Sequence, residues 1–375
     1  MSNSVFVSVR DSLHINYLQQ WAGDVLDDIL YVSSYDALLQ FHSKVIIIET
    51  IEANNRFELT RQLLKQKNYV VFCNCFESNN YHQFMDLHRD LLNKFTNYAV
   101  VGNSDDSYGG LAVNLNEFYF ATATDLNKLR AMSTTSGVFS KINKPFKFLF
   151  LNGARRDHRV ELWKNLENRG TLSHSLSSWL TGNESSAGCN IPIKLLPAEY
   201  ESPYIDTEIT GKYKDDWPRY RQLKKDLWRS HWGFGHVVPA QYIDTYFTVV
   251  SETNINGSPF LTEKVYKPIL AGHPFIVASA PGYYDRLHEL GFETFSKYIN
   301  ESFDQEENAA KRLAMIADQI KILCSTDLDK FLLNVKEICL YNQKHYIDSQ
   351  WTTWYKTHIK LKNFFQNTIN ELQKI

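Results

Sequence analysis

The sequence predicts an α/β protein with two parallel-sheet domains, on three observations. Short β-type runs recur along the first half of the chain, with helix-compatible segments between several of them. This alternation is typical of a parallel sheet covered by helices. The alternation restarts after Pro145. The 375 residues, 43% of them hydrophobic, also suffice for two domains that each bury a core.

The first half supplies five expected strands. They are residues 5–9, 29–32, 45–48, 70–75 and 99–101, and the helix-compatible segments 56–67 and 81–95 separate the last three. Composition becomes polar and small over residues 133–144, so we expect the linker there. The sequence therefore predicts an N-terminal domain of residues 1–142.

The second half restarts with strands expected at residues 148–151, 246–251 and 275–278. A helix-rich end begins near Asn308, and the tail from residue 338 is helical by pattern. We divide this half into a C-terminal domain, residues 143–350, and a terminal helix, residues 351–375.

Charge and cysteine content exclude several classes of protein. The 40 basic and 42 acidic residues give a net charge of −2, so no overall field recruits nucleic acid or an anionic membrane. Five scattered cysteines, an odd number, indicate a reducing compartment. The sequence shows no signal peptide and no apolar run of about 20 residues. We therefore expect a cytoplasmic protein without a transmembrane segment.

The stretch SPFLTEKVYKPILAGHPFI, residues 258–276, predicts a loop, a short helix and a buried strand. Ser258 with Pro259 suits a helix start, and Gly272 is a stop signal. Glu263, Lys264 and Lys267 fall within the first turn or two of that helix, whose free N–H groups attract phosphate. A carboxylate beside an ammonium suits the ribose and pyrophosphate of a nucleotide. A solvated charged turn is the alternative interpretation.

A second segment, KFLFLNGARRDHRVELW at residues 147–163, runs from a β-type stretch through a turn into a helical pattern. Arg155, Arg156 and Arg159 fall at the switch from strand to helix. Ligands of open α/β sheets bind at this edge, and cations at a helix start oppose the helix dipole. The pattern therefore indicates a bound anion, and a solvated helix start is the alternative.

Two blocks of this sequence resemble the donor domain of the α1,3-fucosyltransferases. The first is the apolar strand followed by HRVELWKNL, and the second is TYFTVVSETNINGSPFLTEKVYKPILAGHPFIVASAPG. The resemblance spans roughly residues 147–295. It implies a GT-B-type fold, in which two Rossmann-like domains face each other across a cleft and a terminal helix packs back on the first domain.

The resemblance also implies roles for individual residues. Arg159 and Lys264 would bind the pyrophosphate of a nucleotide sugar, Glu263 its ribose, and Glu252 matches an acidic residue of the donor pocket. The full set of expected donor-binding residues is Arg155, Arg159, Glu252, Glu263, Lys264 and Lys267.

Two departures from the family pattern leave the donor open. Phe260 stands where the family often has an aromatic residue with a hydroxyl, and Lys267-Pro268 is an addition. The nucleotide and the sugar therefore need not be those of GDP-fucose.

The resemblance places the catalytic base in the first domain. Inverting transfer needs a group that accepts the proton of the acceptor hydroxyl. Glu77 follows an expected strand and is our first choice, while Asp105, Asp106 and Glu49 have similar positions. We expect no metal and no other cofactor, because the Asp pair is not a DxD motif and cations can neutralise a leaving diphosphate.

The segment KYKDDWPRYRQLKKDLWRSHW, residues 212–232, interleaves basic and aromatic residues. We favour an amphipathic helix with tryptophans inward. Contact with nucleic acid or an anionic glycolipid is the alternative.

These features predict a glycosyltransferase that moves a sugar from a nucleotide-diphosphate donor to an acceptor hydroxyl with inversion. We expect a bacterial or viral enzyme of glycan biosynthesis, with a surface glycan as acceptor. One alternative is a viral enzyme that modifies a hydroxylated DNA base. The other is a non-catalytic scaffold that binds a sugar nucleotide.

Overall fold

The computed structural model describes residues 128–153, 155–180, 191–201, 237–257 and 259–374, and before them five strands and a few single positions. The chain divides into two compact units, residues 1–121 with 350–375, and residues 122–349. The boundaries expected at 142/143 and 350/351 stay predictions.

The first unit contains a parallel sheet of five strands in the order β2-β1-β3-β4-β5. The strands are β1 (Phe6–Ser8), β2 (Ile29–Tyr31), β3 (Ile46–Thr50), β4 (Tyr69–Asn74) and β5 (Tyr98–Gly102). All five strands predicted from the β-type runs are confirmed within a residue or two.

The second unit contains a parallel sheet of four strands in the order β7-β6-β8-β9. The strands are β6 (Phe146–Asn152), β7 (Ser175–Trp179), β8 (Thr245–Ser251) and β9 (Phe275–Ala278). After β6 the chain forms β7, which pairs with one side of β6, and the later strand β8 pairs with its other side. The sheet therefore changes direction between β6 and β8, which is where open α/β sheets bind ligands.

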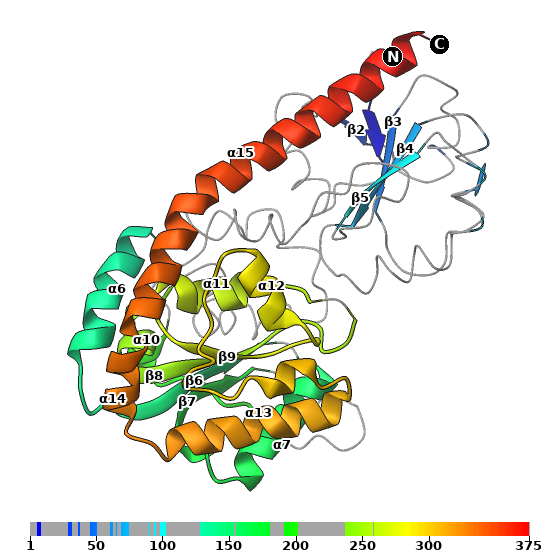
Figure 1. Cartoon of the computed structure of the whole chain (residues 1–375). Helices are drawn as coiled ribbons and strands as arrows, with labels where there is room; N and C mark the ends of the chain where they lie inside the picture. The colour runs from blue at the N-terminus through cyan, green and yellow to red at the C-terminus, as the bar shows by residue number, and fades with distance from the viewer. Residues whose placement is uncertain are drawn as a thin grey trace. The chain divides into compact units, whose positions relative to one another are not determined.

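Helices cover both faces of this second sheet (Figure 1). Helices α7 (Asp157–Asn168) and α13 (Ala309–Cys324) lie on one face, and α11 (Glu263–Leu270) and α12 (Tyr283–Glu289) on the other. The other elements are α6 (Lys128–Ser140), α10 (Pro239–Ile243), α14 (Leu328–Asn334), α15 (Lys336–Lys374), η2 (Leu172–His174), η3 (Ala198–Tyr200) and η6 (Ser302–Gln305).

Aromatic side chains fill the space between the second sheet and α7. The ring of Phe150 on β6 lies 5.9 Å from that of Trp163 on α7, and Trp163 lies 5.3 Å from Trp179 on β7. Phe148 stacks on Phe247 of β8 at 5.5 Å. Every residue of β8 is buried, as expected for a central parallel strand that is covered on both faces.

Three sequence-based expectations need correction. Most of the linker expected at residues 133–144 is helix α6, which packs against α10 and buries Val138. Strand β7, with the sequence SLSSW, was not predicted; its buried Ser175 and Ser177 are hydrogen-bonded to each other and to Leu172 O and Lys194 Nζ. The helix expected from Ser258 begins at Glu263.

The helix-rich end predicted from near Asn308 and the helical tail are confirmed, and the tail is one continuous helix. Asn308 caps α13 by accepting from the Lys311 N–H, and α15 runs from Lys336 to Lys374. In the described part of the chain, no helix combines the length and the apolar character needed to cross a bilayer.

Candidate functional site

The candidate site lies at the carboxyl edge of the second sheet, where β6 and β8 diverge. β6 ends at Asn152 and leads into α7, while β8 ends at Ser251 and is followed by Glu252. Helix α11 begins eleven positions later in the chain and contacts β8 and β9. Both segments that the sequence singled out therefore meet at one edge of one sheet.

Local sequence explains why α11 starts and stops where it does. The Thr262 side chain caps the helix by accepting from the Lys264 N–H at 3.3 Å. At the other end, the N–H of His273 donates to Pro268 O and that of Gly272 to Ile269 O. This is a Schellman motif, with Gly272 at a φ of +63°, as the Gly stop signal predicted.

A fully buried carboxylate, Glu252, organises the start of α11. Its Oε1 accepts from the Thr262 N–H at 3.1 Å and from the Tyr283 hydroxyl at 2.8 Å. Its Oε2 accepts from Thr262 Oγ1 at 2.6 Å and lies 3.8 Å from Lys264 Nζ. Both oxygens are therefore engaged within the protein, and Glu252 fixes the position of α11.

Burial raises the pKa of the Glu252 carboxyl, while Lys264 and the hydrogen bonds from Thr262 and Tyr283 act in the opposite direction. These partners are what make a buried carboxylate tolerable, since an unpaired one is costly. A substitution at any of these partners should therefore change the position of the Lys264 ammonium.

Lys264 and Glu263 form an ion pair on the first turn of α11. Lys264 Nζ lies 3.2 Å from Glu263 Oε1 and 3.0 Å from Thr262 Oγ1. Burial acts to raise the pKa of Glu263, but Lys264 and Lys267 outweigh it and hold that pKa below its ordinary value. Glu263 is therefore ionised at neutral pH.

Lys267 lies one turn further along α11 and is 8% exposed. Burial lowers the pKa of its ammonium to about 8, against the attraction of Glu263. Lys267 is therefore cationic at pH 7 and loses its charge at mildly alkaline pH.

Helix α7 adds a buried guanidinium to the same group. Arg159 is 3% exposed, and its Nη2 donates to Ser251 O at 3.3 Å and to Glu252 O at 3.2 Å. Burial lowers the pKa of Arg159 to about 10, so it stays charged at neutral pH. The carboxylates of Glu252 and Glu263 act on Arg159 in the opposite sense.

His158 is the neutral neighbour of Arg159. Its Nε2 lies 3.0 Å from Glu252 O, and because a carbonyl only accepts, the ring proton is on Nε2. Burial and the charge of Arg159 lower the pKa of His158 to about 4. His158 therefore adds a hydrogen bond to the site without adding charge.

The structure thus brings five of the six expected donor-binding residues together. We call Arg159, Glu252, Glu263, Lys264 and Lys267 the charge cluster. It holds three cations against two carboxylates, which favours an anionic ligand. The sixth, Arg155, precedes α7, and its Nη2 lies 3.9 Å from Asp157 Oδ1.

The expected base lies outside the described residues. Glu77, Asp105, Asp106 and the segment 212–232 are all in undescribed parts of the chain, and of Glu49 only the backbone in β3 is described. Glu77 and Asp106 therefore stay predictions.

The sequence analysis missed three members of the site. Thr262 could have been found, since a threonine directly before a helical Glu is a capping signal. His158 precedes Arg159 in the first block, but nothing local shows that it meets a carbonyl of β8. Tyr283 lies 31 positions from Glu252, so only the tertiary structure joins them.

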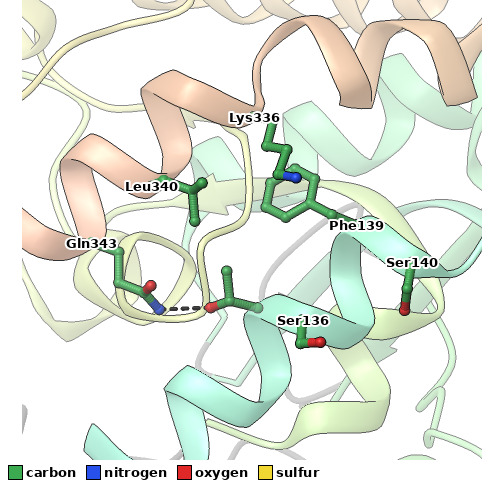
Figure 2. Close-up of a pocket in the computed structure, with 7 residues that line it drawn as sticks. Ser136, Phe139, Ser140, Lys336, Leu340 and Gln343 are labelled. Atoms are coloured by element: carbon green, nitrogen blue, oxygen red, sulfur yellow. Dashed lines mark hydrogen bonds between the residues drawn. The ribbon is translucent and has the colours of Figure 1, made fainter.

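A groove of about 380 Å³ lies between α6 and the start of α15 (Figure 2). Gln343 Nε2 donates to Thr135 Oγ1 and to Leu270 O, both at 2.6 Å, and Thr135 Oγ1 donates to Ala271 O at 3.2 Å. These bonds place the groove at the C-terminal end of α11. It is therefore separate from Glu263 and Lys264 at the other end of that helix.

The described residues include no group of three or more His, Cys, Asp or Glu that could hold a metal ion. That the reaction needs no metal stays a prediction.

Comparisons with known proteins give little more. No family model matches the chain, and no curated protein matches it. A solved structure of an alpha1,3-fucosyltransferase with GDP-fucose is similar to it at 12% identity, over 98% of this chain and 92% of that chain, with a TM-score of 0.38. A TM-score this low carries no argument about function, so the residues and their geometry must carry it.

Proposed function

We propose that this protein is a glycosyltransferase that binds a nucleotide-diphosphate sugar at the charge cluster and transfers the sugar to an acceptor hydroxyl. The single observation that carries the proposal is the convergence of Arg159, Lys264 and Lys267 at the edge where β6 and β8 diverge. Parallel α/β sheets bind nucleotides at that edge, and helix starts favour phosphate.

The charges of the cluster suit a diphosphate that leaves. When the bond between the anomeric carbon and the diphosphate oxygen breaks, the diphosphate gains negative charge. Lys264 and Arg159 are already held near their carboxylate and carbonyl partners, so they can stabilise that charge with little reorganisation. This is how a transferase can work with cations of the protein itself.

The carboxylates have different roles in this proposal. Glu263 is ionised and 6% exposed at the helix start, so it can accept hydrogen bonds from ribose hydroxyls. Glu252 is fully buried with both oxygens engaged, so it positions Thr262 and Lys264 instead of binding the donor. Glu77 or Asp106 would take the proton of the acceptor hydroxyl as it attacks the anomeric carbon.

The resemblance of the two sequence blocks supports a donor of the GDP-fucose type, and the departures at Phe260 and Lys267 leave the sugar and the base to be measured. A glycan acceptor and an inverting outcome belong to the same proposal.

The test measures nucleotide binding and sugar transfer for the full-length wild-type chain and for its Lys264→Ala variant. Calorimetry with GDP, UDP, ADP and CDP should detect at least one nucleotide, and Lys264→Ala should weaken its binding and lower transfer by about 100-fold or more. Lys330→Ala is the matched control, because Lys330 is exposed on α14.

Two outcomes would contradict the proposal. Nucleotide binding that Lys264→Ala leaves unchanged would remove the diphosphate from the charge cluster. Binding without hydrolysis or transfer of any nucleotide sugar would favour the non-catalytic scaffold.

A further inference from the structure

Three polar side chains end neighbouring strands of the second sheet in one row. Asn152 pairs with Trp179 in the register of β6 and β7. The register of β6 and β8, with Leu149 opposite Thr248, brings Ser251 opposite Asn152. Partners in parallel strands share a face, so Asn152, Trp179 and Ser251 lie side by side on one face. We call these three residues the polar row.

The polar row is buried, yet four of its side-chain nitrogen and oxygen atoms have no hydrogen-bond partner in the described part of the chain. Asn152 and Trp179 are each 1% exposed, and Ser251 is 4% exposed. Among the residues that the structure describes, no hydrogen bond reaches Nδ2 or Oδ1 of Asn152, Nε1 of Trp179 or Oγ of Ser251. Native proteins keep few such atoms, and each needs an explanation. Four in one row indicate a polar ligand group.

The polar row adjoins the charge cluster. Ser251 directly precedes Glu252, and its carbonyl accepts from Arg159 Nη2 at 3.3 Å. Trp179 contacts Trp163 of α7, the helix that carries Arg159. A nucleotide whose diphosphate lies at the charge cluster can therefore place its base beside the polar row.

We propose that the polar row recognises the base of that nucleotide; this inference rests on the proposed function, because it concerns the same ligand. The Asn152 amide offers a donor and an acceptor side by side. A nucleobase edge carries the complementary pair side by side in one rigid plane, whereas phosphate oxygens only accept. Trp179 adds a donor, and Ser251 adds a hydroxyl that can donate or accept.

The proposal has a consequence for the ligand-free protein. An amide without partners contributes nothing favourable, so Asn152→Ala should leave the Tm of the ligand-free protein unchanged or raise it. If the amide were hydrogen-bonded to buried water, its removal would instead lower the Tm.

The decisive experiment compares affinities of the full-length chain for GDP, UDP, ADP, CDP and pyrophosphate. The wild-type protein should prefer one base. Asn152→Ala should weaken binding of the preferred nucleotide about 10- to 100-fold, towards the level of the others, and leave pyrophosphate binding unchanged. Ser251→Ala should act in the same direction and more weakly.

Ser178→Ala is the matched control. Its hydroxyl is also buried and has no partner among the described residues, but Ser178 pairs with Leu151 and so lies on the opposite face of the sheet. This variant should keep the wild-type preference among bases.

The outcomes separate this inference from the proposed function. Equal wild-type affinity for all four nucleotides, an equal loss for every ligand in Asn152→Ala, or a marked fall in the Tm of that ligand-free variant would overturn the base site. If Lys264→Ala abolishes nucleotide binding while Asn152→Ala changes nothing, the donor site stands and the base site fails. Base discrimination at Asn152 without sugar transfer would keep the base site and overturn the transferase.

Discussion

The two ends of helix α11 are held by different chemistry. At its N-terminal end, Thr262 and Lys264 are bound to the buried carboxylate of Glu252. At its C-terminal end, a Schellman motif at Gly272 and the neutral amide of Gln343 satisfy the last carbonyls. Burying charge costs desolvation, whereas the neutral closure involves no charge. Under the proposed function, the first end binds the ligand and the second closes the fold.

The largest expected effect is at the charged end. Glu252→Ala leaves Thr262, Tyr283 and Lys264 without their shared partner, so we expect a loss of about 3–5 kcal/mol in the free energy of unfolding. Nucleotide affinity should fall with it. Urea unfolding of the full chain, followed by Trp fluorescence, measures the first effect and calorimetry the second. Exposed Glu167 on α7 provides the control, Glu167→Ala. Unchanged nucleotide affinity in a folded Glu252→Ala protein would show that ligand binding does not depend on the charged end of α11.

The second effect is at the neutral end. Gly272 has a φ of +63°, and a Cβ there would lie 2.6 Å from Thr135 Cγ2. Gly272→Ala should therefore cost about 2 kcal/mol or more. The same unfolding experiment measures it. Gly170→Ala is a matched control, because Gly170 has a φ of +71° and nothing within 4 Å of its added Cβ. The difference between the two variants isolates the clash from the backbone strain.

A smaller effect should follow from removing the amide beside the groove of Figure 2. Gln343→Ala deletes hydrogen bonds to Leu270 O and Thr135 Oγ1, so we expect a loss of about 1–2 kcal/mol in stability. Nucleotide affinity should stay at the wild-type value. A selective loss of affinity with unchanged stability would show that the neutral end also serves the ligand.

The smallest expected effect is a pH dependence of nucleotide binding. Burial lowers the pKa of Lys267 from 10.5 to about 8, so its charge is lost as the pH rises through 8. Affinity for a nucleoside diphosphate should then fall about fivefold between pH 7 and 9. Calorimetry at several pH values measures this, and Lys267→Met should flatten the profile. Identical profiles in the two proteins would assign the titration to another group.

The stability contribution of Lys267 has the opposite sign. Its pKa in the folded protein lies below the unfolded value, so the unfolded chain binds more protons between about pH 8 and 10.5. The contribution is therefore present at high pH and is lost as the pH falls through 8. Stability and nucleotide affinity should change in opposite directions across this window.

The strands show how far local sequence reaches. The β-type runs at β6, β8 and β9 were predicted because a parallel strand covered by helices on both faces is mostly apolar. Strand β7 was not, since its serines give no apolar pattern, and the Ser177 hydroxyl meets its partner Lys194 only in the tertiary structure. The linker expected at residues 133–144 failed for a similar reason. Polar and small residues also form α6 when a partner helix buries one side of it.

The site divides in the same way. The alternation of strand and helix patterns was enough to predict the α/β class of both sheets, because such periodicity is a local property of the chain. All five members of the charge cluster were expected from the two segments and their family resemblance. Only the tertiary structure decided that Glu252 is engaged on both oxygens, that Tyr283 reaches it, and that Asn152, Trp179 and Ser251 share a row. Those facts depend on strand order and register, which bring together residues that are distant in the chain and leave no mark in the local pattern.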